Sequence, residues 1–160
     1  IVVRRGRPTT IDNERDEGFQ AAIEGSGIEI LGMEHGNWNR DDSFAVMQDF
    51  LSKYPKIDAV WASDDDMAIG VLAAIKEAGR MDEMWVLGGA GMKEMVKRVA
   101  DGDPYVKANV TYPPSMSGTA IEITALNFVS NAPVSGTFVI GSVLITQENA
   151  EKFYFPDSPF

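Results

Sequence analysis

Apolar positions along the chain alternate between short continuous runs and runs with a spacing of three or four residues. The continuous runs, typical of buried strands, cover residues 1–5, 28–34, 59–62, 85–88 and 106–111. The helical spacing covers residues 11–24, 41–54, 67–79, 92–100 and 116–129, and a last extended run covers residues 137–146. Strands and helices that alternate with short connections predict an α/β fold, a doubly wound parallel sheet covered on both faces.

The loops that follow the strands are expected to meet at one edge of this sheet. Right-handed crossovers place every strand-to-helix connection at the carboxyl ends of the strands, where open α/β sheets bind ligands. The loops concerned are residues 8–15, 35–41, 63–66, 89–91 and 112–115. Five loops at one edge predict a ligand cleft.

One of these loops carries three acidic residues directly after a strand. Asp64, Asp65 and Asp66 precede the helix of residues 67–79, where carboxylates cap the helix and meet the positive end of its dipole. We expect Asp65 to be the cap and Asp66 to face solvent. Three consecutive side chains point in different directions, so we predict no metal site and no cofactor here.

Composition excludes several classes of function. The 160 residues suffice for a domain with a substantial core, and the net charge of −10 without a basic stripe argues against nucleic-acid binding. The chain has no cysteine and a single histidine, His35, which excludes disulfides, zinc–sulfur sites and histidine metal clusters within it. No apolar run approaches the length that spans a bilayer. Because the chain opens on a strand-like run without a leader, we interpret it as a mature or internal part of a protein.

Four segments carry motifs of a known family. Residues 64–70 read D-D-D-M-A-I-G and residues 78–80 read A-G-R, similar to N-D-x-M-A-x-G followed by A-G-[KR]. N-E-R-D-E-G-F at residues 13–19 is similar to an R-x-x-G-F helix. The remaining matches are an aromatic loop with an M-Q-x-L-L helix at residues 36–51 and an I-T-x-E-N-A segment at residues 144–150. The chain thus resembles the periplasmic sugar-binding proteins of ABC importers, the ribose-binding-like group with the type I periplasmic-binding fold.

The resemblance implies one half of a two-lobed protein. Residues 1–112 would form the second, C-terminal ligand-binding lobe, residues 113–146 a crossover helix and strand that belong to the first lobe, and residues 147–160 a closing tail. The first lobe's main strands are absent from this sequence. Apolar residues of the crossover helix therefore need a partner, through dimerisation, rearrangement or a missing first-lobe segment; they are Ile121, Ile123, Leu126 and Phe128.

The resemblance also implies a ligand site. Arg15 matches an arginine that grips sugar hydroxyls, although it could be an ordinary first-turn arginine paired with Asp12 or Glu14. Trp38 matches an aromatic residue that stacks on the C–H face of a sugar, although it could only cap the edge of the sheet. Asp64 takes the place of an asparagine that binds hydroxyls.

Two positions depart from the family pattern. Ala90 stands where a ligand-binding aspartate is usual, and Tyr112 stands where a glutamine often binds the sugar. Backbone N–H groups at Gly91, where a helix is expected to begin, could bind a ligand oxygen. These departures favour a polyol or a deoxy sugar as ligand.

Three classes of function remain open at this point. The resemblance favours a periplasmic or lipid-anchored receptor that delivers a sugar or polyol to an ABC permease and breaks no bond. The alternative is the effector-binding domain of a sugar-responsive transcriptional repressor, which has a similar fold. An enzyme such as a glycosidase needs a second carboxylate opposite Asp64, and only Asp12 is available at this edge. We therefore expect no enzyme.

Overall fold

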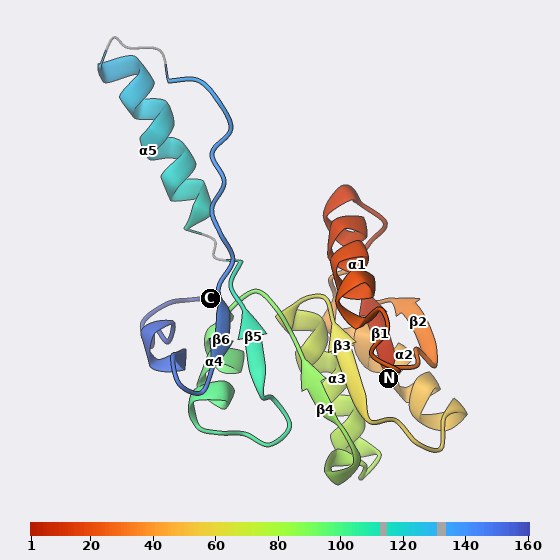
Figure 1. Ribbon diagram of the computed structural model, residues 1–160. Helices are drawn as coiled ribbons and strands as arrows, with labels where there is room; N and C mark the ends of the chain where they lie inside the picture. The colour runs from red at the N-terminus through yellow and green to blue at the C-terminus, as the bar shows by residue number, and fades with distance from the viewer. Residues whose placement is uncertain (113–114, 131–133) are drawn as a thin grey trace.

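The computed structural model describes residues 1–112, 115–130 and 134–160. Its elements alternate as the sequence predicts (Figure 1). The strands are β1 (Val2–Arg5), β2 (Gly32–His35), β3 (Ala59–Ala62), β4 (Trp85–Leu87), β5 (Ala108–Val110) and β6 (Leu144–Thr146). The helices are α1 (Thr10–Ile23), α2 (Arg40–Lys53), α3 (Asp65–Glu77), α4 (Lys93–Ala100) and α5 (Met116–Val129), with 3₁₀ turns at Met81–Glu83 and Ala150–Lys152.

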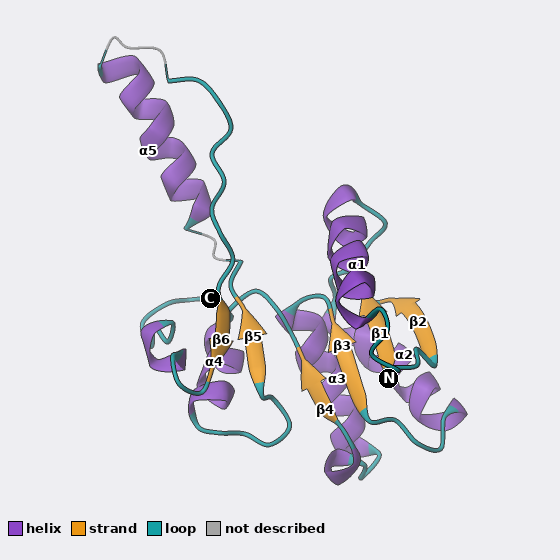
Figure 2. Ribbon diagram, in the orientation of Figure 1, coloured by secondary structure: helices purple, strands orange, loops and turns teal. Residues whose placement is uncertain are grey.

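The first four strands form a parallel sheet in the order β2-β1-β3-β4. This confirms the predicted fold class. Helices α2 and α3 cover one face of the sheet, and α1 lies against the other (Figure 2). The connections therefore pass over both faces of the sheet, and the carboxyl ends of the parallel strands lie at one edge.

The fifth predicted strand, β5, is not part of the four-stranded parallel sheet. Residues of β5 pair antiparallel with β6 in a separate two-stranded sheet. A single parallel bridge between Ala90 and Thr111 connects β5 to the loop after β4. The predicted extended run of residues 137–146 is a strand only at its end, because only Leu144–Thr146 lies beside another strand.

The core lies between the sheet and helices α2 and α3. Val2, Val60 and Val86 point from three adjacent strands into it and are at most 1 % exposed. Helix α3 approaches α2 closely because it carries a glycine at the crossing, where a Cβ on Gly70 would lie 2.1 Å from the carbonyl oxygen of Arg40. The apolar face of α3 therefore anchors the helix whose first residues lie at the candidate ligand edge.

Side chains cap helices α2 and α3. Asn39 caps α2, since its side-chain oxygen accepts from the N–H groups of Asp41 and Asp42 at 2.9 and 3.0 Å. Asp64 caps α3, and the predicted cap Asp65 is fully buried instead. The cap of α3 therefore lies one residue earlier than the sequence predicts.

Residues 115–130 and 134–143 lie in an arm that extends away from the sheet (Figure 1). Helix α5 confirms the predicted helix, and none of its residues is buried. Ile121, Leu126 and Phe128 are 69 %, 58 % and 79 % exposed. The predicted break at Pro113 and Pro114 lies outside the described residues. Across the described ranges, no helix combines the length and apolarity needed to cross a membrane.

Candidate functional site

A pocket of about 310 Å³ opens at the carboxyl ends of the strands. Predicted site residues Arg15, Ala90 and Tyr112 line it. The other lining residues are Phe19, Trp61, Ser63, Gly88, Gly89, Val110, Thr111 and Ser142. Helix α1 and the segments that follow β3, β4 and β5 therefore meet at this edge, whereas the predicted loop of residues 35–41 contributes no residue to the pocket lining.

Arg15 lies between two aromatic rings at this pocket. Its Cζ is 5.3 Å from the centroid of the Trp38 ring and 5.0 Å from that of Tyr112. Nη1 donates to the carbonyl oxygen of Ser63 at 2.5 Å, the one hydrogen bond of this guanidinium within the described ranges. Within the described ranges, Arg15 does not pair with Asp12, and its other guanidinium N–H groups have no protein acceptor. Cation–π contacts of this kind hold the guanidinium in place.

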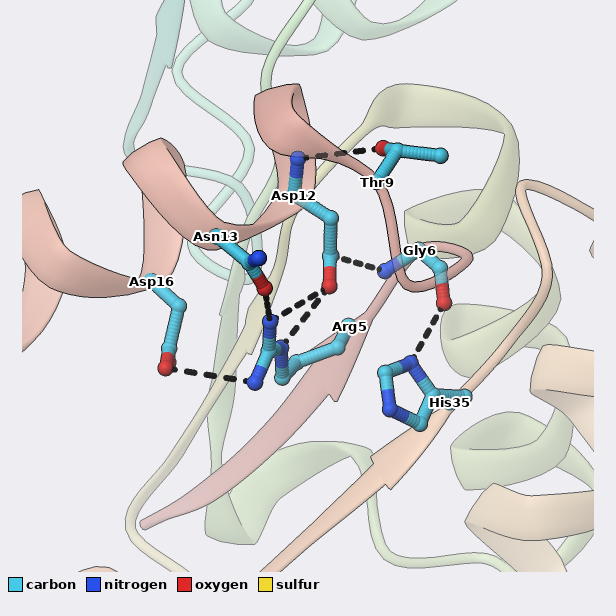
Figure 3. Close-up of polar contacts among 7 residues, drawn as sticks. All are labelled: Arg5, Gly6, Thr9, Asp12, Asn13, Asp16 and His35. Carbon is cyan, nitrogen blue, oxygen red and sulfur yellow. Dashed lines mark hydrogen bonds and ion pairs between the residues drawn. The ribbon is translucent and has the colours of Figure 1, made fainter.

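A second arginine fixes the start of the helix that carries Arg15. Arg5, the last residue of β1, donates to Asp12 at 2.9 Å and to Asn13 at 2.8 Å, and its guanidinium also lies 3.4 Å from Asp16 (Figure 3). The carboxylate of Asp12 also accepts from the N–H of Gly6 at 2.7 Å. Helix α1 buries no apolar residue, so this polar cluster is what holds its first turn at the pocket.

Trp38 lies on the same side of the sheet edge as Arg15. The loop before it turns sharply, with φ values of 56° at Asn37 and 55° at Trp38. The indole covers Gly6, where a Cβ would come within 2.1 Å of the ring. Trp38 therefore covers the end of β1 and flanks Arg15, and it is not among the residues that line the pocket itself.

Asp64 lies half-buried between the pocket and the start of α3. Its Oδ1 accepts from the N–H of Met67 at 2.8 Å, which leaves Oδ2 for another donor. Burial raises the pKa of this carboxyl, and the charge of Asp66 raises it further, whereas the Met67 hydrogen bond and the Arg15 charge lower it. Asp66, predicted to face solvent, is partly exposed and pairs with Arg40 at 2.7 Å.

The predicted role of the Gly91 backbone is wrong. Its N–H donates to Asp65 at 3.0 Å and to Asn109 at 3.1 Å, and the next N–H, of Met92, donates to Asp65 at 2.8 Å. Helix α4 begins only at Lys93. The N–H groups at this corner are therefore already paired within the protein and do not face a ligand.

Sequence reasoning missed four features of the pocket. Phe19 and Trp61 stack with ring centroids 4.2 Å apart and form an apolar wall. The hydroxyl of Ser63 is buried without a hydrogen-bond partner in the described parts of the chain. Trp61 lies in β3 and Ser63 directly follows this strand. Their position next to the acidic loop is the sequence signal that could have identified them as pocket residues. Ser142 belongs to the segment returning from the arm, and no local pattern marks it.

The same edge offers no metal centre. Nowhere in residues 1–112, 115–130 and 134–160 do three His, Cys, Asp or Glu side chains lie together as metal ligands. His35 instead donates from Nδ1 to the carbonyl oxygen of Gly6 at 2.7 Å (Figure 3). The site combines one guanidinium, aromatic rings, a hydroxyl and a carboxylate, which together suit an uncharged ligand with several oxygens.

Comparison with known proteins points to one family. Residues 1–128 match the periplasmic binding protein domain. The ribose import binding protein RbsB of Escherichia coli (strain K12) is 30 % identical over 140 residues, which is 88 % of this chain and 46 % of the relative. The xylitol-binding protein of Mycolicibacterium smegmatis is 33 % identical over 110 residues, 68 % of this chain and 29 % of the relative. The chain thus spans less than half the length of these curated relatives.

Solved structures agree with this comparison. An ABC transporter solute-binding protein from Mycobacterium smegmatis with bound glycerol has a TM-score of 0.85 at 30 % identity, over 98 % of this chain and 54 % of that protein. A galactofuranose-binding protein has a TM-score of 0.84 at 27 % identity, over 96 % of this chain and 54 % of its own. These relatives are binding proteins.

Proposed function

The chain belongs to the periplasmic binding protein family, and we propose that it is one lobe of a receptor for a sugar or polyol. The receptor closes two lobes around its ligand and delivers it to an ABC permease. It makes and breaks no bond. Its place is the periplasm, or the outer surface of a membrane to which it is lipid-anchored.

The placement of Arg15 carries this proposal. A guanidinium held between the rings of Trp38 and Tyr112 keeps several N–H donors in a fixed orientation at the pocket. Adjacent hydroxyl oxygens of a sugar or polyol can accept from such a fork. The free Oδ2 of Asp64, at the start of α3, supplies an acceptor for a hydroxyl proton.

The apolar part of the pocket favours a ligand with few hydroxyls on one side. Ala90 provides no acceptor, and the stacked rings of Phe19 and Trp61 form a wall beside it. A C–H edge packs against such a wall without leaving a hydroxyl unpaired. We therefore favour a polyol or a deoxy sugar over a fully hydroxylated hexose.

The exposed arm fits a two-lobed receptor. A compact protein of 17.5 kDa exposes about 7,900 Å² by the usual scaling with mass, whereas this chain exposes 9,390 Å². The apolar surface of residues 115–130 and 134–143 would be covered by a first lobe, with residues 1–112 forming the second lobe and residues 147–160 the closing tail. Dimerisation through the same surface is the alternative.

A thermal-shift screen of the two-lobed protein against pentoses, hexoses and polyols tests the proposal. A specific ligand raises the melting temperature because it binds the folded state alone. Trp38→Ala removes one of the two rings that hold Arg15 at the pocket and should abolish the shift. The control Trp85→Ala, on the strand β4, removes neither of these rings and should keep it. Failure of every compound to stabilise the wild-type protein would contradict the proposed ligand class.

A further inference from the structure

Asp65 is a fully buried carboxylate that touches neither solvent nor the pocket. Its Oδ1 accepts from Asn109 Nδ2 at 2.6 Å, and its Oδ2 accepts from the N–H groups of Gly91 and Met92 at 3.0 and 2.8 Å. The side chain therefore joins the start of α3 to β5 and to the corner between β4 and α4. Hydrogen bonds to an ionised carboxylate are stronger than neutral ones.

Asn109 is equally buried and completes the same network. Its Oδ1 accepts from Gly91 N–H at 3.1 Å and from Val110 N–H at 2.8 Å. The N–H of Gly91 is thus shared between Asp65 and Asn109. Gly88 leaves room for the carboxylate, since a Cβ there would lie 2.4 Å from Asp65 Oδ1.

The network holds a strained corner that faces the ligand. Ala90 has a φ of 154° and Gly91 a φ of 83°. Such a conformation is strained for a non-glycine residue and persists only where its surroundings impose it. The carbonyl of Ala90 accepts from the N–H of Tyr112 at 2.8 Å, so the position of the corner also sets that of the aromatic ring beside Arg15.

We propose that Asp65 and Asn109 are positioning residues for ligand binding, which hold Ala90 and Tyr112 in the pocket through the Gly91 backbone. The proposal rests on the proposed function. It makes affinity depend on the charge of a carboxylate that the ligand never touches.

The charge state of Asp65 gives this role a measurable signature. Burial raises the pKa of Asp65 to about 6, although the hydrogen bonds from Asn109, Met92 and Gly91 oppose the shift. Asp64 is the charged neighbour that raises it further, while Lys93 beyond the corner is bound to the carbonyls of Pro156 and Ser158. A protonated carboxyl loses acceptor capacity, so the corner is held less firmly below pH 6.

Amide resonances test this coupling without any ligand. We expect the backbone ¹⁵N–¹H signals of Gly91 and Met92 to titrate with a midpoint near pH 6 in the wild-type chain. The titration should disappear in Asp65→Asn, which presents an NH₂ group where the protein needs an acceptor. It should persist in the control Asp66→Asn, an adjacent and partly exposed residue paired with Arg40. Signals that do not titrate in the wild type would overturn the proposal.

Calorimetry of the two-lobed protein with D-ribose, xylitol, glycerol and myo-inositol gives the second measurement. Asp65→Asn should weaken binding about tenfold, the loss expected for one charge-assisted hydrogen bond. Exchanging the pair, Asp65→Asn with Asn109→Asp, keeps one carboxylate and one amide facing each other and should recover most of the affinity. Wild-type affinity in Asp65→Asn, or no recovery in a folded double variant, refutes the positioning role. Absence of binding by the wild type refutes the proposed ligand class instead, and the amide titration then decides the present proposal alone.

Discussion

Arg4 lies in the middle of β1 with its guanidinium fully buried. None of its three side-chain nitrogens has a hydrogen-bond partner within the described residues. The ring of Phe50 lies beside the guanidinium, with its centroid 5.7 Å from Cζ. A buried charge without a bonded partner destabilises a protein, and its replacement by an apolar side chain of similar size is often stabilising.

The pKa of Arg4 measures how unfavourable this charge is. Burial lowers it from the ordinary value for arginine to about 10, although the charges of Glu34 and Asp42 oppose the shift. At 1.36 kcal/mol per pKa unit, this corresponds to about 3 kcal/mol against the charged form. We therefore expect Arg4→Met to raise the free energy of unfolding by up to about 3 kcal/mol, because methionine fills the space without a charge.

Arg5→Met is the matched control on the next residue of the same strand. Arg5 pairs with the buried carboxylate of Asp12 at 2.6 Å, so its removal leaves that charge without its counter-ion. Loss of one partner of a buried pair costs about 3–5 kcal/mol. The same chemical change at neighbouring positions should thus alter stability in opposite directions.

Urea unfolding followed by tryptophan fluorescence measures both effects. Arg4→Met should shift the midpoint to higher urea and Arg5→Met to lower urea, with slopes that match the wild type. For a domain of this size, the expected gain in Arg4→Met corresponds to roughly 6–12 °C in melting temperature. A loss of stability in Arg4→Met would show that the guanidinium has a binding partner and that the reasoning from its burial is wrong.

Two further predictions concern packing and pH. Gly70→Ala should destabilise the protein by about 1–3 kcal/mol, since the added Cβ meets the backbone oxygen of Arg40. Gly18→Ala, with open space around it on α1, should stabilise the protein by about 0.5–1 kcal/mol. Urea midpoints that change equally in both variants would contradict the close contact between α2 and α3 at Gly70. Arg80 lowers the pKa of Glu83 from 4.5 to about 2, so this pair stabilises the fold above pH 4.5 and the contribution disappears as the pH falls toward 2. Glu83→Gln should flatten that part of the stability profile, and an unchanged profile would show that the pair contributes nothing.

Local sequence determined the order of elements and the edge at which the site lies. Apolar runs and helical spacing depend on near neighbours, and the hand of the crossovers follows from chain chirality, so strand alternation alone predicts a parallel sheet with its loops at one edge. Arg15, Trp38 and Asp64 were found because they belong to these loops and to motifs of a family. The glycine-rich corner at residues 88–91 was visible for the same reason.

Tertiary structure decided which groups at that edge are free to act. Three adjacent aspartates read alike in the sequence, yet one caps α3, one is buried against Asn109 and one pairs with Arg40. The N–H of Gly91 is occupied, Ser142 reaches the pocket from the arm, and Arg4 is buried whereas the adjacent Arg5 pairs with Asp12. Each of these outcomes depends on contacts between residues that are distant along the chain, and such contacts are set by how the layers pack and not by any local period.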